Sequence, residues 1–434
     1  MYMETTLSDI ADGCKYGFVD GPFGSNLPSS CYKHKGIPVI RGCNLSIGKF
    51  RYIDQGYCFV DNIVLDRLSR STARKFDIIF TKKGTIGQIG IIPKNALYNL
   101  YLLSSNQMRL RVDISKADPY FVYYYLTQKN IIKKIIRDSE STGVPKTNLA
   151  YFRSFPIKLP ALSEQQAIAH ILGTLDDKIE LNRRQNATLE AMAQAIFKDW
   201  FVDFGPVHAK MEGRQPEGMS REIADLFPDR LDDEGKPEGW ERKKLGDLIT
   251  FYSERIKSDK LTESNYVSTE NMLSDKKGIT KASSLPTTDS VPAFCTGHIL
   301  VSNIRPYFKK IWFATFDGGR SNDVLDFCPS IVGTNYFIFN ILICDAFFNF
   351  MMQTAKGSKM PRGDKNAIMA YPVVAPTEVL QRAYSSLVEV YYKKINSNVL
   401  KNEVLTSLRD TLLPKLISGE LRVPDAEKMV ADIV

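Results

Sequence analysis

The sequence predicts a mixed α/β (α+β) protein in which two globular domains are joined by two long antiparallel coiled-coil helices, related by a pseudo-twofold internal repeat. Three observations predict this fold. Matched residues recur at a constant spacing in the two halves, and each half ends in a long heptad pattern. The chain has 434 residues, of which 44% are hydrophobic, and this is enough apolar material for two cores.

The internal repeat has an offset of 216 residues, which is the separation of Pro145 from Pro361. We expect one insertion-free register to carry this offset through much of both halves. The matched pairs are Pro145 with Pro361, Pro156 with Pro372, Pro160 with Pro376, Gln165 with Gln381, Ser105-Asn106 with Ser321-Asn322, Asn182 with Asn398, and Asn186 with Asn402. Upstream the offset is 238, from Leu7 to Leu245, so the first part of the second copy is shorter.

Each copy is a variable block followed by a helical tail. The predicted segments are residues 1–162 (first globular domain), 163–205 (first long helix), 206–376 (linker and second globular domain), 377–420 (second long helix) and 421–434 (C-terminal tail). The linker at 205–239 is dense in proline, glycine and charge, and it includes one short predicted helix near 221–227.

The two blocks mix strand and helix patterns. In the first block we predict strands at Ile37–Ile40, Phe76–Phe80, Ile86–Ile92 and Met108–Val112, then a helix at Pro119–Arg137 capped by Asp118. In the second block we predict strands at His298–Ser302, Lys310–Thr315 and Asn335–Phe339, then a helix near Cys344–Ala355. The glycines at 84, 87 and 90 indicate a hairpin turn, because an apolar run follows them where a dinucleotide site needs a helix.

The tails predict long helices with a coiled-coil seam. Ser163 and Gln166 have the spacing of a capping box, and the pattern continues to Asp203, for a helix of roughly 60 Å. We expect Pro414 and Gly419 to end the second helix, with a kink at Leu413.

Both seams turn polar at the same central place, where four asparagines stand in seam positions: Asn182, Asn186, Asn398 and Asn402. Asparagine in a seam fixes the register of two helices, because a slipped partner leaves its amide unpaired. The alternative is that these side chains face solvent beside a broader apolar stripe.

Composition and motifs exclude several classes. The formal charge of +8 permits a nucleic-acid partner but does not require one. The longest apolar run, Ile331–Met352, is interrupted by polar residues and predicts no membrane span, and the N-terminus lacks a signal-peptide pattern, so we expect a cytoplasmic protein. The seven cysteines are too far apart to form metal-binding pairs, so we expect reduced thiols and no metal site.

The sequence also lacks the common catalytic motifs. We find no phosphate-binding loop and no His-Glu-x-x-His, and the four histidines stand alone. The string nearest to the amino-methyltransferase motif Asn/Asp-Pro-Pro-Tyr/Phe is Asn303–Tyr307, which has one proline and a misplaced arginine. We therefore predict no catalytic residues and no cofactor in this chain.

Basic residues cluster at two equivalent turns of each block. One turn follows a predicted strand and the other precedes a closing strand. The candidate DNA-binding residues at these turns are Lys82, Lys83, Thr85 and Lys146 in the first copy, and Arg305, Lys309, Lys310, Lys359 and Arg362 in the second. A single basic turn is usually solvated surface, but the same two turns are basic in both divergent copies, which favours contact with phosphates or base edges.

The sequence resembles a specificity subunit of a type I restriction-modification system over nearly its whole length. The most specific stretches are Pro160–Glu190, Pro237-Glu238-Gly239-Trp240, Gly84-Thr85-Ile86-Gly87 and Leu413–Glu420. The resemblance implies two target-recognition domains, each reading one half of a bipartite site in double-stranded DNA. It also implies helices that act as a ruler and dock two methyltransferase (modification) subunits, which bring S-adenosylmethionine. It further implies restriction/translocase subunits that bring ATP and Mg²⁺. Arg409 departs from the apolar seam of the second helix.

We therefore predict a non-catalytic DNA sequence-recognition subunit with an asymmetric bipartite target. The alternative is a coiled-coil scaffold whose end domains bind other proteins. A fused methyltransferase is a third possibility that the missing motif disfavours. A sequence-dependent DNA footprint distinguishes the first two.

Overall fold

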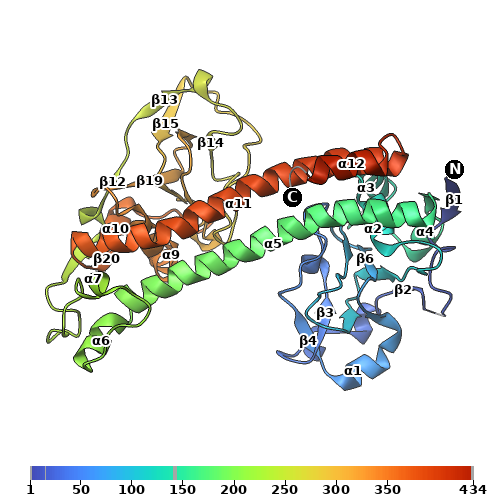
Figure 1. The fold of residues 1–434 in the computed structure, drawn as a ribbon, viewed down its shortest axis with the longest axis horizontal. Helices are drawn as coiled ribbons and strands as arrows, with labels where there is room; N and C mark the ends of the chain where they lie inside the picture. The colour runs from blue at the N-terminus through green and yellow to red at the C-terminus, as the bar shows by residue number, and fades with distance from the viewer. Residues whose placement is uncertain (1, 15, 140–143, 432–434) are drawn as a thin grey trace. The chain divides into compact units, whose positions relative to one another are not determined.

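The computed structural model describes residues 2–14, 16–139 and 144–431, so the last residues of the predicted tail (432–434) lie outside the described part (Figure 1). The chain divides into two compact units. Unit 1 runs to Asn182 and resumes at Leu400, and unit 2 comprises Arg183–Val399. The long helices α5 (Leu162–Phe201) and α11 (Glu378–Ser418) each contribute one part to each unit.

Unit 1 contains two four-stranded sheets, with the strand orders β2-β9-β6-β7 and β4-β3-β8-β5. The strands of the first sheet are β2 (Phe18–Asp20), β9 (Gln107–Leu110), β6 (Ile78–Thr81) and β7 (Ile89–Ile91). Those of the second are β4 (Cys58–Val60), β3 (Ile37–Ile40), β8 (Tyr101–Leu103) and β5 (Thr72–Ala73). A separate antiparallel pair joins β1 (Met3–Thr6) to β10 (Pro156–Leu159).

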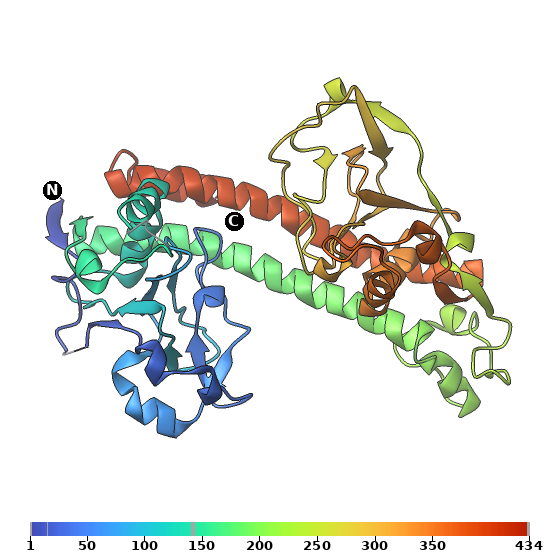
Figure 2. The ribbon, with the colours of Figure 1, turned by 180° about the vertical axis from the view of Figure 1, so that it is seen from behind.

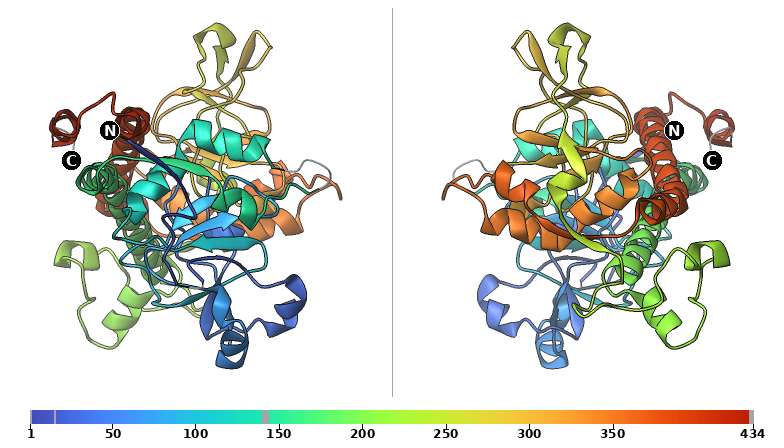
Figure 3. Two further views of the ribbon diagram at one scale, coloured as in Figure 1. Left: turned by 90° about the vertical axis from the view of Figure 1, so that its right-hand side faces the viewer. Right: turned by 90° about the vertical axis from the view of Figure 1, so that its left-hand side faces the viewer.

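Helices complete the cores of unit 1. The second sheet packs against α1 (Asn62–Arg67), and the core of the first sheet includes α2 (Pro119–Thr127), α3 (Lys129–Arg137), α4 (Leu149–Arg153) and α12 (Val423–Ala431). Phe80 of the sheet packs against Phe152 of α4, with ring centroids 4.5 Å apart. Figure 3 shows α12 beside the last turns of α11, where Ala426 and Val430 join the same core.

Unit 2 repeats this plan with the sheets β12-β19-β16-β17 and β13-β15-β18-β14 (Figure 2, yellow and gold). The first sheet consists of β12 (Ile249–Phe251), β19 (Val324–Pro329), β16 (Ile299–Ser302) and β17 (Ile311–Phe313). The second consists of β13 (Arg255–Lys257), β15 (Ser290–Phe294), β18 (Gly318–Arg320) and β14 (Tyr266–Val267). The terminal pair is β11 (Glu241–Lys244) with β20 (Pro372–Ala375), antiparallel as β1 is to β10.

The helices of unit 2 are α6 (Gly205–Met211), α7 (Arg221–Ala224), α8 (Asn335–Ile343), α9 (Asp345–Gln353) and α10 (Lys365–Met369). An aromatic cluster at the end of α5 closes the core, where Phe201 packs edge-on against Phe337 and Tyr384. Of the linker helices, the sequence predicted α7 but not α6.

The strand registers define the repeat more finely than the sequence does. Ile79 pairs with Arg109 as Leu300 pairs with Asp326, so β9 and β19 differ by 217 positions. The predicted pairing of Ser105-Asn106 with Ser321-Asn322 is therefore wrong by one residue. The offset has returned to 216 at Pro145 and Pro361, so the second copy is one residue shorter between its β19 strand and this proline. Identity at a two-residue string cannot detect such a shift.

Three local predictions are wrong. Asn335–Phe339 is not a strand but the start of α8, because Phe337 through Ile343 are buried on all sides and such a run carries no period; the strand of this region is β19. The helix predicted at Pro119–Arg137 is two helices, since Gln128 is extended (φ −58°, ψ 141°). Pro414 does not end α11, which continues to Ser418 before Gly419 turns left-handed (φ 77°).

Within the described ranges, no single helix is both long and apolar enough to cross a membrane. The pair α8 and α9 meets that test only when taken together, by length and composition, and it is bent by 61°.

Candidate nucleic-acid interface

In unit 1, three loops meet beside the end of β6. The backbone N–H of Lys82 donates to Asn106 O (2.8 Å), that of Gly84 to Pro145 O (3.1 Å), and that of Thr147 to Lys82 O (2.9 Å). We call these loops junction 1, comprising residues 81–85, 104–106 and 145–147. It brings together the two basic turns that the sequence marks in the first copy.

Unit 2 builds the same arrangement from different residues. The N–H of Asn303 donates to Asp323 O (2.8 Å), that of Arg305 to Pro361 O (2.8 Å), and that of Gly363 to Asn303 O (3.1 Å). These loops are junction 2, comprising residues 302–310, 321–323 and 361–363. The backbone bonds match those of junction 1, while the side chains differ, so the two copies present different chemistry from one scaffold.

The backbone at the centre of each junction is left-handed. Gly84 has φ 99° and the equivalent Arg305 has φ 49°, a conformation that favours glycine and costs energy for arginine. Arg305 is exposed, and it opens a short 3₁₀ turn, Pro306–Phe308, which ends at a second left-handed residue, Lys309 (φ 50°). Non-glycine residues held in this region are common at functional sites.

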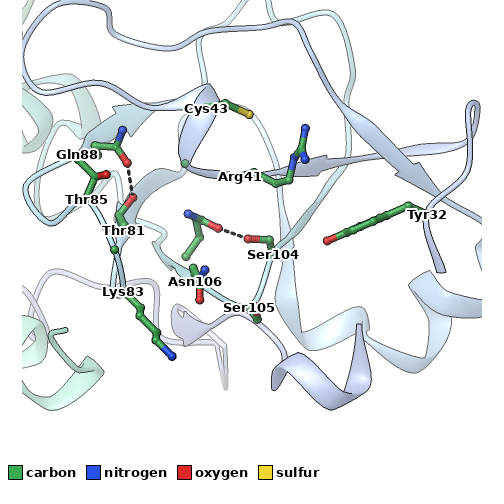
Figure 4. Close-up of a pocket in the computed structure, with 13 residues that line it drawn as sticks. Tyr32, Arg41, Cys43, Thr81, Lys83, Thr85, Gln88, Ser104, Ser105 and Asn106 are labelled. Carbon is green, nitrogen blue, oxygen red and sulfur yellow. Dashed lines mark hydrogen bonds between the residues drawn. The ribbon is translucent and has the colours of Figure 1, made fainter. Parts of the chain in front are cut away.

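A pocket of about 530 Å³ adjoins junction 1 (Figure 4). Its lining residues are Tyr32, Arg41, Gly42, Cys43, Thr81, Lys83, Gly84, Thr85, Gln88, Ser104, Ser105, Asn106 and Gln107. None of these residues, all of them in the described ranges, carries a carboxylate. The pocket therefore combines two cations with amide and hydroxyl groups, a composition that suits a polar anionic ligand.

Hydrogen bonds orient the side chains of this pocket. Arg41 Nη2 donates to Gly56 O (3.0 Å) and so fixes the guanidinium plane. Thr81 Oγ1 donates to Gln88 Oε1 (3.1 Å), and Gln88 Nε2 donates to Leu45 O (3.3 Å). Figure 4 shows Arg41 and Tyr32 on one side of the pocket, with Thr81 and Lys83 on the other.

Sequence reasoning missed Arg41, Gln88 and Asn106. A signal for Arg41 was present, because Arg41-Gly42 directly follows the buried strand β3, as Lys82-Lys83-Gly84 follows β6. Gln88 and Asn106 have no such signal, since an isolated amide in a loop is ordinary surface in most sequences.

Six of the predicted site residues are exposed: Lys83, Thr85, Lys146, Arg305, Lys359 and Arg362. Four of the predicted cations contact acceptors: Lys82 with Asp20 (3.2 Å), Lys309 with Asp345 (3.0 Å), Arg362 with Asp323 (3.2 Å) and Lys310 with Thr269 O (2.5 Å). Burial lowers the pKa of Lys310, which makes it the weakest candidate for a phosphate contact.

In each first sheet, a buried acidic residue contacts a basic residue at the neighbouring strand, and the acidic and basic positions are exchanged between the two copies. Asp77 pairs with Arg111 (2.9 Å) and Arg109 (3.5 Å) in unit 1. In unit 2, His298 stands at the position of Asp77 and Asp326 at that of Arg109, and their side chains are 3.0 Å apart. Burial lowers the pKa of Arg109. These residues support the sheet from within and are not at the junction surface.

The four seam asparagines form two pairs, one in each unit. In unit 1, Asn182 Nδ2 donates to Asn402 Oδ1 (2.8 Å); in unit 2, Asn398 Nδ2 donates to Asn186 Oδ1 (2.8 Å). These two bonds are equivalent under the 216-residue offset. The remaining amide hydrogens reach backbone carbonyls across the seam, from Asn402 to Ile179 and from Asn186 to Ile395, each at 3.4 Å.

Arg409 departs from the apolar seam because it has an acidic partner. Its Nη1 lies 2.7 Å from Asp176 Oδ1 of α5.

Within the part of the chain that the structure describes, no group of three or more His, Cys, Asp or Glu side chains could hold a metal ion. All seven cysteines are described, and they are free thiols.

Comparison with known proteins adds independent evidence. Residues 66–191 match the model of the type I restriction modification DNA specificity domain. The MjaIX type I restriction enzyme specificity subunit of Methanocaldococcus jannaschii is 26% identical, over 93% of this chain and 91% of its own length. The HindI specificity subunit of Haemophilus influenzae is 24% identical, over 84% of this chain and 91% of its own.

A solved structure has a similar fold. The S subunit of a type I restriction-modification system from M. genitalium superposes with a TM-score of 0.54 at 15% identity, covering 96% of both chains. The predicted family and the predicted non-catalytic role are thereby confirmed, since the relatives are specificity subunits and the matched model is a DNA specificity domain. Over most of its length, this chain is similar to specificity subunits of type I restriction-modification systems.

Proposed function

We propose that this chain selects a bipartite target in double-stranded DNA, and that each unit reads one half of it. The observation that carries the proposal is the pair of junctions, which share their backbone bonds but differ in side chains. Two readers with different chemistry specify different half-sites, so the target is asymmetric.

In unit 1, the reading groups are the side chains of the pocket. An arginine such as Arg41 can donate two hydrogen bonds to the O6 and N7 of guanine, and amides such as Gln88 and Asn106 match the N6 and N7 of adenine. Lys83, exposed at the rim, is placed to contact phosphate. In unit 2, the corresponding groups are Arg305 and the half-exposed ring of Tyr307 (48% exposed).

The long helices supply the docking surface for two methyltransferase subunits. Exposed apolar side chains on the helices support this assignment: Leu400 (55% exposed) and Val404 (53%) in unit 1, and Val390 (60%) and Val399 (45%) in unit 2. Apolar side chains that stay exposed on a helix are typical of partner surfaces. The methyltransferase subunits bring S-adenosylmethionine, and restriction/translocase subunits bring ATP and Mg²⁺; the complex acts in the cytoplasm.

The experiment is methylome sequencing of cells with and without this gene, and with Arg41→Ala or Arg305→Ala in its place. We expect one asymmetric bipartite motif that disappears with the gene, and relaxed preference in a different half for each variant. The purified chain alone transfers no methyl group. A motif that survives deletion of the gene, or a DNA footprint that ignores sequence, overturns the proposal in favour of a protein-binding scaffold.

A further inference from the structure

We propose that Arg409 and Asp176, on the two long helices, position the DNA-reading pocket of unit 1 through the loop formed by residues 41–53. They are positioning residues, since neither lines the pocket. The inference rests on the proposed function and adds a coupling between the helices and one of the two half-sites.

The first observation is a charged cluster inside unit 1 that includes both helices and the loop. Asp176 of α5 accepts from Arg409 of α11 (2.7 Å) and from the hydroxyl of Tyr124 (2.8 Å). Arg409 Nη2 donates to Gly48 O of the loop (3.3 Å). Arg51 of the same loop donates to Asp177 and lies 3.8 Å from Asp176. The side chains of Asp176 and Arg409 are 8% and 11% exposed, so solvent screens them little.

The second observation is that the loop is continuous with the pocket. Asn44 holds it closed, because its Nδ2 donates to Ile53 O (2.9 Å) while its Oδ1 accepts from the N–H of Arg41 (2.9 Å). The middle of the loop lies along the edge strand β7, where Arg51 O accepts from the N–H of Ile91 (3.0 Å). A displacement of Gly48 or Arg51 by the helices is thereby transmitted to Arg41 and to the Leu45 carbonyl that holds Gln88.

Stability alone does not account for this cluster. Buried ion pairs are frequently no more stabilising than apolar residues of similar size. What an apolar residue cannot provide is a directional bond from α11 to a loop carbonyl. The arginine fork binds a carboxylate and a carbonyl at once, which fixes the loop relative to both helices.

The third observation is that the cluster belongs to one copy only. At the 216-residue offset, the positions of Arg409 and Asp176 are Ala193 and Tyr392 in unit 2. There, Tyr384 donates to Ala193 O (2.9 Å) and Tyr392 donates to Asn340 Oδ1 (3.2 Å), within the helical core. The coupling is therefore asymmetric, and its loss affects the half-site of unit 1 alone.

The test uses Arg409→Met in the full complex, because methionine restores an apolar seam. The substrate is a duplex that carries the motif methylated by the wild-type complex, together with duplexes changed at single positions in either half. We expect discrimination to fall about fivefold or more in the half that Arg41→Ala relaxes, and to be unchanged in the half that Arg305→Ala relaxes. Arg382→Met, which removes a similar charge from an exposed pair on α11, serves as the matched control.

A second measurement reports on the loop without DNA. Hydrogen exchange at the amides of Ile53 and Ile91 is expected to accelerate in Arg409→Met, and also in Arg409→Lys, which keeps the charge beside Asp176 but lacks the fork that bonds Asp176 and Gly48 O together. Equal loss in both halves, or no change in either, overturns the positioning role while the Arg41 and Arg305 variants still report DNA reading. If those two variants also change nothing, the proposed function itself fails.

Discussion

At the residue scale, Arg305 combines an exposed reading group with a strained backbone. We expect Arg305→Ala to lose roughly 1 to 3 kcal/mol of binding free energy for the target, and to relax the base preference at one position of one half-site. Arg305→Gly loses the same contact but relieves the left-handed conformation, so it unfolds at a higher temperature than Arg305→Ala. Calorimetry and binding to single-position variants of the target measure both effects. Equal melting temperatures for the two variants contradict the strain at this site.

The division of the cations into exposed and engaged groups has a measurable consequence in salt. If the exposed Lys359 contacts phosphate, Lys359→Ala weakens binding to DNA of every sequence alike. It also reduces the slope of log K against log salt by about one unit. Lys309→Ala reduces the slope by less, because Asp345 already neutralises part of its charge. Titrations at several salt concentrations distinguish the two. A larger change for Lys309 than for Lys359 contradicts this division.

We expect Glu190, on the part of α5 within unit 2, to make the stability of the fold depend on pH. Burial raises the pKa of its carboxyl, so the folded state holds the proton more tightly than the unfolded state. Its contribution to stability is full below the unfolded pKa of about 4.3 and is lost as pH rises through the higher folded pKa. Glu190→Gln therefore unfolds at a higher temperature than wild type at neutral pH, and this advantage shrinks in acid. Glu403→Gln, at an exposed position on α11, is the matched control.

At the element scale, the asparagine bonds test the seam. Asn402→Ala leaves the buried amide of Asn182 without its partner and costs about 1 to 3 kcal/mol of unfolding free energy. Replacing both residues with leucine removes the unpaired group and recovers much of that loss. Urea denaturation of Asn182→Leu, Asn402→Leu and the double variant gives the coupling energy. Additive losses show that the two amides do not interact.

The elements also show what the sequence can and cannot predict. The long helices and their polar layer follow from a period sustained over many turns, and most strands of the first sheets follow from short apolar runs between glycines. The run beginning at Asn335 was mistaken for a strand because it is apolar on every face. Helix α11 passes Pro414 because Leu413 and Leu416 are buried beside it, a tertiary effect that outweighs local preference.

The candidate site was predicted only in part, because some of its residues are marked by local sequence and others come together only through the fold. Lys83 and Arg305 stand in basic turns that recur in both copies, so the repeat marked them. Arg41 and Asn106 come from loops whose approach depends on the pairing of distant strands, and one sequence does not contain that information in local form. The contact of Arg409 with Asp176 could not be predicted for the same reason, because Asp176 lies on the other long helix.

At the scale of the whole molecule, the proposed ruler makes a quantitative prediction. One heptad inserted into each helix, after Asn186 and before Asn398, adds about 10 Å, which is the rise of about three base pairs. We expect the non-specific spacer of the methylated motif to lengthen by about three base pairs with both half-sites unchanged. Insertion into one helix alone misaligns the asparagines and lowers stability. An active double-insertion complex with its original spacer shows that the helices do not set the distance.

The asparagine bonds have one more consequence, for how such chains evolve. Because Asn182 donates to Asn402 as Asn398 donates to Asn186, the seam is isologous: each helix offers the other the same surface that it receives. A recombinant gene that exchanges one variable block for a foreign one leaves these bonds intact. A chain assembled from two copies of a single repeat is expected to retain them and, under the proposed function, to select a palindromic target. Under the same proposal, exchanging a variable block changes the specificity without any change in the asparagine bonds of the seam.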